Sequence, residues 1–215
     1  MDVLAQAPLL SGHQLALRRG NAWLFKDLHF SLPAGEALWV RGPNGSGKTS
    51  LLRLVVGLIQ ADAGSVYWRG VPLKKADSYA RALVYIGHTQ ALKDDLTAAE
   101  SLEFLATLHC RPHTASSIIA ALRQLSVYTR RNQLVRTLSQ GQRKRVALAR
   151  LALETKPGLW VLDEPYDALD AEGIDAVDAL VLRHVARGGC ALFTSHLPRQ
   201  LGATPVRALN LGPTP

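Results

Sequence analysis

The sequence predicts an α/β fold with a mainly parallel sheet core, an antiparallel β subdomain and an inserted helical subdomain. Three observations favour it. Alternating apolar and polar residues come first, a glycine-rich loop lies between an apolar run and a helical pattern, and helical segments precede two later apolar strands. The 215 residues suffice for one substantial core, so we expect a single domain over residues 1–215.

An antiparallel β segment is expected at the start of the chain. From about residue 12 to residue 40, apolar and polar positions alternate, which is the pattern of half-buried strands. Turn residues at Asn21 and Pro33 interrupt this alternation. The last part, residues 37–40, is the strand expected to lead into the glycine-rich loop.

A helix and further strands are expected after the glycine-rich loop. Residues 49–58 place apolar side chains, Leu58 included, on one face of a helix that we expect to end near Gly57. Residues 64–73 have the pattern of a short hairpin, and residues 83–86 that of a buried strand. These elements continue the α/β core.

The pattern then changes to helical segments, which predict an inserted helical subdomain at about residues 91–140. Thr97 followed by Glu100 is a plausible helix cap, and Pro112 separates two helices.

The parallel α/β core resumes after this insertion. Residues 159–162 and 190–194 are apolar strand runs, and the helical residues 172–187 lie between them. Two strands joined by a helix are typical of a parallel sheet.

The glycine-rich loop satisfies G-x-x-x-x-G-K-[ST] without a departure. Its glycines let backbone N–H groups turn inward around an anion. The Lys48 ammonium reaches the β- and γ-phosphates, and the Thr49 hydroxyl takes a place on Mg²⁺. We therefore expect a nucleoside triphosphate site made by Gly42, Pro43, Asn44, Gly45, Ser46, Gly47, Lys48 and Thr49.

Two carboxylates, Asp163 and Glu164, directly follow the strand at residues 159–162. The carboxyl ends of strands in a doubly wound sheet are where ligands bind. Asp163 is positioned to hold Mg²⁺ through water, and Glu164 can polarise the water that attacks the γ-phosphate. The expected reaction is hydrolysis.

The segment Leu138-Ser139-Gln140-Gly141-Gln142 resembles the L-S-G-G-Q signature of ATP-binding cassette (ABC) domains, and a helix and the Asp-Glu strand follow it as in that family. The resemblance implies a P-loop ABC cassette that binds ATP with Mg²⁺ and hydrolyses it. In the family, Ser139, Gly141 and Gln142 would cover the γ-phosphate held by the other subunit, and the start of a helix suits an anion.

Further positions match motifs of that family. Asp170 resembles the residue that communicates across the dimer. His196 resembles the switch histidine, which orients Glu164 and the attacking water. Gln90 is the candidate for the glutamine that contacts Mg²⁺ and this water, and a register shifted by one residue would place Thr89 there instead.

Two features depart from the family pattern. Gln140 stands where the commonest signature has glycine, so a side chain enters a place that the partner's phosphate approaches. The aromatic residue that stacks on adenine falls near Arg19 by spacing. The guanidinium of Arg19 could stack, and Trp23 is the nearby aromatic residue.

Within the family, the sequence resembles the haem-exporter ATP-binding subunits of cytochrome c maturation, through residues 86–88, 96–104 and 145–151. This likeness implies an ATPase that drives haem export or releases a haem-loaded chaperone. It also implies a homodimer with integral membrane permease subunits, peripheral on the cytoplasmic face of a bacterial inner membrane. The ATPase subunit of another small-molecule or lipid exporter is the alternative.

Composition limits the remaining classes. The net charge of +8 fits nucleic acid, an anionic membrane surface or an acidic partner, so a non-transport cassette ATPase acting on nucleic acid is a further alternative. Such proteins usually carry long coiled coils or a second cassette, and we expect no nucleic acid partner here. The signature argues against a P-loop kinase or GTPase.

Cysteine usage and hydropathy complete the expectations. Cys110 and Cys190 belong to no metal-binding pattern, so we expect unpaired thiols and a reducing setting. No apolar stretch approaches the about 18 residues that span a bilayer, so association with a membrane is expected through a partner.

Overall fold

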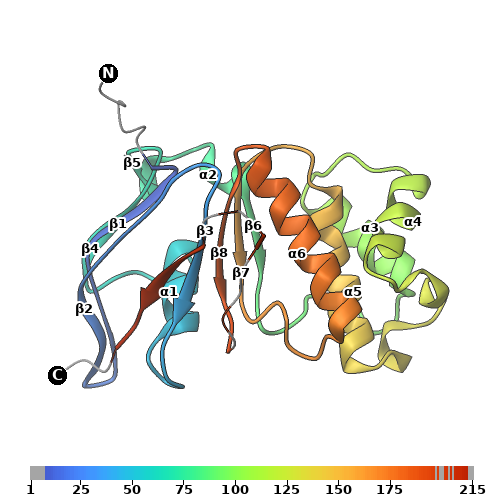
Figure 1. The fold of residues 1–215 in the computed structure, drawn as a ribbon, viewed down its shortest axis with the longest axis horizontal. Coiled ribbons are helices and arrows are strands. Elements are labelled where there is room, and N and C mark those ends of the chain that lie inside the picture. The colour runs from blue at the N-terminus through green and yellow to red at the C-terminus, as the bar shows by residue number, and fades with distance from the viewer. Residues whose placement is uncertain (1–7, 197, 199–200, 203, 205, 213–215) are drawn as a thin grey trace. The chain divides into compact units, whose positions relative to one another are not determined.

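The computed structural model describes residues 8–196, 198, 201–202, 204 and 206–212, and the chain forms two compact units (Figure 1). The first unit comprises Met1–Tyr85, Pro157–Asp163 and His184–Pro215, and the second comprises Ile86–Lys156 and Glu164–Arg183. The expected helical insertion therefore lies within the second unit, which also includes later residues. The assignment of residues 1–215 to a single domain stays a prediction.

An antiparallel sheet in the first unit confirms the strands expected at the start of the chain. It has the order β2-β1-β4-β5, with β1 (Leu10–Arg19), β2 (Ala22–Leu32), β4 (Ala63–Trp68) and β5 (Val71–Pro72). The β1-β2 hairpin turns at Gly20, whose φ of 62° is a conformation that glycine adopts without steric cost. The buried residues of β1 come in two runs of three, 10–12 and 15–17, and not in the strict alternation that the sequence predicted, since bulges interrupt its pairing with β2.

The second sheet is the predicted parallel core. Its order is β6-β7-β8-β3-β9, from β6 (Leu83–Ile86), β7 (Leu159–Leu162), β8 (Cys190–Thr194), β3 (Ala37–Arg41) and β9 (Val206–Asn210). The pairs β7-β8, β8-β3 and β3-β9 are parallel. Every residue of β7 and β8 is buried, which explains their continuous apolar sequences.

Helix α1 (Lys48–Val55) lies between the two sheets of the first unit and packs its leucines into their shared core (Figure 1). The prediction that the helix would carry Leu58 on its apolar face is wrong. The helix ends at Val55, three residues earlier, and Leu58 is 64% exposed. Gly57, with a φ of 79°, takes the left-handed conformation just after the helix end.

Short helices connect the two sheets of the first unit. They are η1 (Leu73–Lys75) and α2 (Tyr79–Ala82), which precede β6. The Tyr79 hydroxyl donates to the Val55 carbonyl at 2.7 Å and so closes the end of α1. That bond is buried, so it satisfies a carbonyl that the helix itself leaves open.

The second unit contains the helices expected at about residues 91–140, and it also contains most of α6 (Ala171–Ala186), which the sequence assigned to the α/β core. The helices before α6 in this unit are α3 (Ala98–Leu108), α4 (Ala115–Gln124), η2 (Tyr128–Arg130), η3 (Val135–Thr137), α5 (Gln140–Ala149) and η4 (Arg150–Leu153). Thr97 and Glu100 form the expected capping box of α3, and α3 and α4 are separate helices on either side of Pro112. Cys110 and Cys190 are both unpaired, as expected.

Candidate functional site

The glycine-rich loop joins β3 to α1, as the strand-loop-helix pattern predicted. Gly47 caps α1 in the left-handed conformation, with a φ of 94°, and offers no side chain to the first turn of the helix. The N–H groups at such a helix start attract anions. The first turn of α1 also contains no acidic residue that would oppose a phosphate.

Close packing explains why glycine stands at two positions of this loop. A Cβ at Gly42 would lie 2.4 Å from the Leu211 carbonyl oxygen and 2.6 Å from Ser46 Oγ. A Cβ at Gly47 would lie 3.0 Å from Leu24 Cβ. The loop can therefore keep this path only without side chains at these positions.

The polar groups of the loop form a set of donors. Lys48 Nζ donates to the carbonyl oxygens of Gly42 at 2.9 Å and Pro43 at 3.3 Å, so the ammonium lies over its own loop. Ser46 Oγ is buried and has no hydrogen-bond partner within the described part of the chain. An ammonium, a hydroxyl and a helix start together fit a phosphate group.

Asp163 lies at the end of β7 and is 1% exposed. Its Oδ1 accepts hydrogen bonds from Thr49 Oγ1 at 3.3 Å and from Thr194 Oγ1 at 2.9 Å. Asp163 Oδ2 is buried and has no hydrogen-bond partner among the described residues. The structure thus brings together Thr49 and Asp163, the two oxygen-bearing residues that we expected to hold Mg²⁺, and these donor atoms suit that ion.

His196 lies two residues beyond the end of β8 and is exposed. It lines a hollow of about 460 Å³ that also borders Gly42 and Pro43 of the glycine-rich loop. Trp39 of β3 donates its indole Nε1–H to the Ser195 carbonyl at 3.0 Å, inside the protein. Strand β3, which leads into the glycine-rich loop, therefore also holds Ser195, the residue before His196.

In the second unit, Ser139 caps α5, the helix of the signature motif. Ser139 Oγ accepts from the Gln142 N–H at 3.3 Å, and the Ser139 N–H donates to Gln142 Oε1 at 3.0 Å. This capping box shapes the helix start that the resemblance assigns to ATP. Gln140 is exposed beside it.

Gly141 lies where α5 meets the segment after Glu164. A Cβ at Gly141 would lie 2.6 Å from the Ala168 carbonyl oxygen. Both Glu164 and Ala168 have positive φ angles, 48° and 62°, which are uncommon for residues with side chains. Such strain clusters at functional sites, and here Glu164 directly follows Asp163 in the chain.

Asp170 is tied to its own unit. Its Oδ1 caps α6 by accepting from the Gly173 N–H at 2.9 Å, and it also accepts from the Arg145 guanidinium of α5. The Gly173 bond is the main reason that the pKa of Asp170 is lowered. Arg145, 6% exposed, also donates to the Leu125 carbonyl at 2.7 Å, so one buried arginine links the signature helix to Asp170 and α4.

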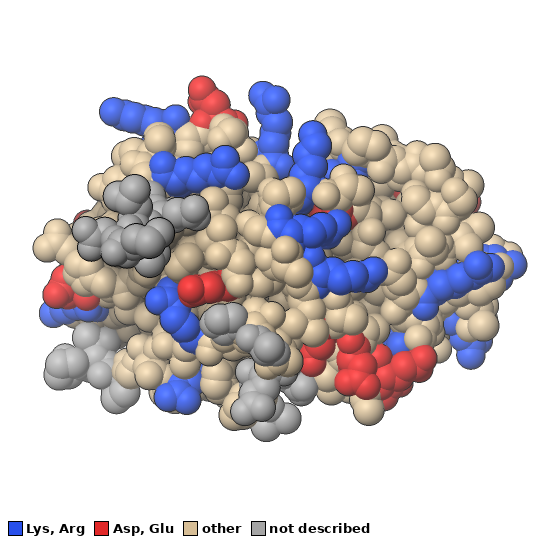
Figure 2. Space-filling model, turned by 45° about the horizontal axis from the view of Figure 1, so that its top comes forward, with Lys and Arg blue, Asp and Glu red and all other residues tan. Residues whose placement is uncertain are grey.

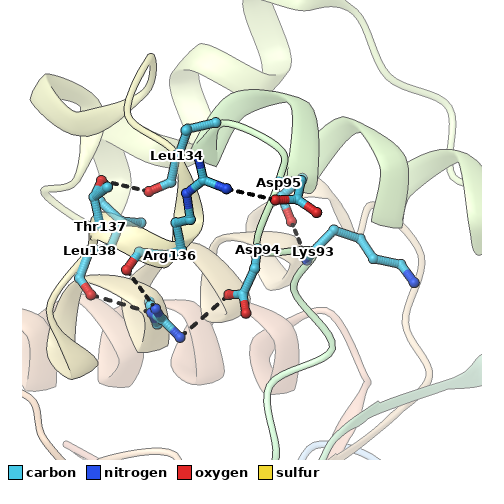
Figure 3. A network of polar contacts seen from close by, with 9 residues as sticks. Lys93, Asp94, Asp95, Leu134, Arg136, Thr137 and Leu138 are labelled. Carbon is cyan, nitrogen blue, oxygen red and sulfur yellow. Dashed lines mark hydrogen bonds and ion pairs between the residues drawn. The ribbon is translucent and has the colours of Figure 1, made fainter.

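Gln90 lies four residues beyond β6 and is half-buried, while Thr89 is exposed. A polar network then ties the segment after Gln90 to residues on both sides of Ser139 (Figure 3). Arg136 donates to Asp95 at 2.9 Å, and Arg143 lies 3.5 Å from Asp94.

Backbone hydrogen bonds reinforce this network. The Val135 N–H donates to the Leu96 carbonyl at 2.9 Å, and the Ala98 N–H donates to the Gln133 carbonyl at 3.0 Å. Backbone N–H and C=O groups need a hydrogen-bond partner once they are buried, whereas an exposed ion pair adds little stability. These backbone hydrogen bonds therefore hold the two segments together more firmly than the ion pairs do. The segments before α3 and before α5 therefore form one connected element.

The candidates for adenine stacking differ in their surroundings. Trp23 is partly buried, and its ring lies under two cations, with the Arg18 guanidinium 4.9 Å and the Lys26 ammonium 4.6 Å from the ring centroid. Arg19 is exposed. The ring of Trp23 is therefore not simply core packing, and either residue stays a candidate.

Sequence reasoning missed Thr194, Trp39 and Arg145. Each donates a hydrogen bond to a candidate site residue or to its neighbour in the chain. The donor and the acceptor are between 25 and 156 positions apart in the sequence. Thr194 lies two residues before His196, and this nearness to a motif was the available signal.

Figure 2 shows Lys and Arg side chains projecting from many separate places on the face drawn. Some of them are paired, as Arg18 is with Asp62 at 3.1 Å. Proteins that bind nucleic acid commonly gather such residues in one patch or stripe.

The described helices include none whose length and apolar character would let it cross a membrane.

Comparisons with known proteins agree with this geometry. Residues 25–167 match the family model described as "ABC transporter". The chain is 42% identical over 205 residues to the cytochrome c biogenesis ATP-binding export protein CcmA of Albidiferax ferrireducens, covering 95% of this chain and 97% of that protein. It is 44% identical over 199 residues to the protein of the same name from Pseudomonas putida, covering 92% and 94%.

A solved structure has the same fold. The ATP-binding subunit of an ABC transporter superposes with a TM-score of 0.76 at 26% identity, over 88% of this chain and 80% of that chain. The glycine-rich loop, the signature segment 138–142 and Asp163 all lie within residues 25–167, the part of this chain that the family model matches. The fold, the order of the motifs and the similar proteins therefore all indicate the same family.

Proposed function

The chain belongs to the ABC transporter family, and on that premise we propose that it is the ATP-hydrolysing subunit of an exporter that serves cytochrome c biogenesis. The observation that carries the ATPase assignment is the contact between Thr49 of the phosphate loop and Asp163 at the end of β7. The names of the relatives at 42% and 44% identity support the pathway.

ATP would bind at the phosphate loop. The backbone N–H groups before α1 and the Lys48 ammonium would hold the phosphates, and Ser46 Oγ could donate to them. Thr49 and Asp163 would hold Mg²⁺, with Gln90 as a further candidate ligand. Bound Mg²⁺ would neutralise charge on the β- and γ-phosphates. On ATP binding, Lys48 would exchange its loop carbonyls for phosphate oxygens.

Hydrolysis would depend on Glu164 and His196. The Glu164 carboxylate would accept a proton from the attacking water, because a carboxylate beside a strand end can act as a general base. His196 would hydrogen-bond the γ-phosphate and orient the water. Loss of the base in such a reaction typically lowers the rate by about 10² to 10⁴.

Two copies of the chain would complete each ATP site. Ser139, Gly141 and Gln142 of one copy would cover the γ-phosphate on the Lys48 side of the other. Asp170 would communicate between the two sites. Gly141 lies in the first turn of α5, where backbone N–H groups can bind an anion. ATP binding would close the dimer, and hydrolysis would release it.

The membrane link would come from partners. The resemblance implies integral permease subunits of cytochrome c maturation and a peripheral position on the cytoplasmic face of a bacterial inner membrane. The cargo would be haem or a haem-loaded chaperone. The element that joins the segment after Gln90 to the signature helix is a plausible route for motion toward such a partner.

Isolation of the Glu164→Gln variant from native membranes with ATP tests this function. We expect parental ATP binding, a rate of hydrolysis lowered by about 10² to 10⁴, and co-purification of cytochrome c maturation subunits. Glu103→Gln, an exposed change on α3, is the matched control and should hydrolyse ATP at the parental rate.

Each part of the proposal has its own contrary result. Hydrolysis by Glu164→Gln at the parental rate would contradict the role of Glu164. A different permease, ribosomes or nucleic acid in the isolated complex would overturn the pathway and leave the ATPase assignment in place.

A further inference from the structure

We propose that Thr194 is a positioning residue for the metal-binding carboxylate of Asp163, an inference that rests on the ATPase function proposed above. Thr194 is the last residue of β8, and Asp163 directly follows the neighbouring strand β7. Their hydrogen bond, from Thr194 Oγ1 to Asp163 Oδ1, is 2.9 Å long. Both residues are almost fully buried, at 0% and 1% exposure.

Strand register places these two side chains next to each other. β7 and β8 are parallel, and Leu162 pairs with Phe193 at their last registered position. The next residues are Asp163, which directly follows β7, and Thr194, the last residue of β8. Residues at matching positions of neighbouring strands project to the same face of a sheet. This register explains why the Thr194 hydroxyl lies within hydrogen-bond distance of the Asp163 carboxylate.

The contacts of Asp163 divide its two oxygen atoms. Oδ1 accepts from both Thr194 and Thr49, and the Thr194 bond is the shorter, at 2.9 Å against 3.3 Å. Oδ2 is buried and accepts no hydrogen bond from the described residues. Thr194 thus orients the carboxylate through one oxygen and leaves the other available for a ligand of the site.

Thr194 becomes more important when the nucleotide site is filled. The motif assigns the Thr49 hydroxyl to Mg²⁺, and in that role Thr49 would turn its oxygen to the metal ion. The hydroxyl of Thr194 would then be the donor that keeps Asp163 Oδ1 in place. Groups that orient a metal ligand in this way tune the affinity of the site.

The end of β8 is itself held firmly. Trp39 donates its indole N–H to the carbonyl of Ser195, the residue after Thr194, at 3.0 Å. Val40, the next residue of β3, pairs with Thr194 in the sheet. Strands β7, β8 and β3 lie side by side (Figure 1). The Thr194 hydroxyl is therefore presented from a rigid backbone, as a precise site requires.

A purely structural role of the hydroxyl predicts that Thr194→Val loses stability without any change in metal affinity. Threonine and valine have nearly the same shape, and both suit a buried strand. The positioning role instead predicts that the hydroxyl matters for metal binding and is unimportant for metal-free nucleotide binding. Thr194→Val removes the hydroxyl at nearly constant volume, and Thr194→Ser keeps it, so the two variants form a matched pair.

The experiment uses the full chain with ATP and Mn²⁺, which stands in for Mg²⁺ and can be followed by electron paramagnetic resonance. We expect Thr194→Val to bind Mn²⁺ in the presence of ATP about 10- to 100-fold more weakly than the parent. Thr194→Ser should bind it as the parent does. ATP binding in EDTA should be equal in all three proteins.

The contrary results are separable. Parental Mn²⁺ affinity in folded Thr194→Val overturns the proposal, and so does an equal loss of ATP binding in EDTA. If Thr194→Val does not fold, Thr194→Cys takes its place, since a thiol is a weak donor of similar size, and the same criteria apply. A parent chain that binds neither ATP nor Mn²⁺ overturns the proposed function, and the assignment of Thr194 falls with it.

Discussion

Acid will destabilise the first unit through His184, a histidine that the fold buries completely, at 0% exposure. Its ring stacks on Trp160, with centroids 4.0 Å apart and an interplanar angle of 10°. Nε2–H donates to the Gly158 carbonyl at 3.0 Å, and Nδ1 has no hydrogen-bond partner in the described part of the chain. Burial lowers the pKa of His184 to about 4. Protonation would place a charged N–H at an unpaired position.

The sign and size of the effect follow from proton linkage. The pKa of His184 is about 4 in the folded chain and 6.5 in a model peptide, so the unfolded chain binds the proton first as the pH falls. The free energy of unfolding is unaffected above the unfolded pKa and decreases below it, until the folded pKa is reached. With about 1.4 kcal/mol per pKa unit, linkage predicts a loss of about 2 kcal/mol between pH 7 and pH 5.

Urea unfolding at pH 7 and pH 5 measures this loss. His184→Gln retains an amide N–H that can donate to Gly158 but cannot titrate in this range. The parent should lose about 2 kcal/mol more than His184→Gln over this interval. His88→Gln, at an exposed position, is the control and should keep the parental pH dependence. Equal pH dependence in the parent and His184→Gln would refute the reasoning.

Two further substitutions test packing at the ends of helices. Gly141→Ala puts a Cβ 2.6 Å from the Ala168 carbonyl oxygen, so we expect the free energy of unfolding to fall by about 1–3 kcal/mol. The exposed Gln140→Ala should change it by less than about 0.5 kcal/mol, and a parental melting temperature for Gly141→Ala would contradict the clash. Tyr79→Phe removes the buried 2.7 Å hydrogen bond to the Val55 carbonyl, so it should cost about 1 kcal/mol in the same urea assay. An unchanged value would show that this bond adds nothing to stability.

Local features of the sequence predicted local features of the fold. Thr97 and Glu100 are three residues apart, and they form the expected capping box of α3. The apolar runs at 159–162 and 190–194 are the buried strands β7 and β8. Such features depend on residues within one or two turns of helix or one strand, and their information is therefore present in a short window.

The end of α1 shows where local reasoning stops. The apolar pattern continues to Leu58, but the helix ends at Val55 because Gly57 takes a left-handed conformation there. Periodicity indicates which side chains could share a face. It does not decide where the backbone leaves the helix, since a single glycine can change the path of the chain.

The candidate site divides in the same way. Motif order in the sequence predicted that Lys48, Thr49, Asp163 and Ser139 are site residues, and the chemistry that they suit stays a prediction. The contact of Thr194 with Asp163 spans 31 positions, and that of Arg145 with Asp170 spans 25. No periodicity links such residues, because the first contact depends on the register of two strands and the second on how α5 meets the start of α6.

The sequence by itself determined the α/β class, the strand, glycine-rich loop and helix at residues 37–55, and the helical insertion, because periodicity, caps and glycine positions act over a few neighbouring residues. The tertiary structure alone decided which hydroxyl holds Asp163, which arginine binds Asp170, and that His184 is buried against Trp160. Those features arise when distant segments pack together, and packing sets the burial, charge environment and hydrogen-bond partners of each side chain.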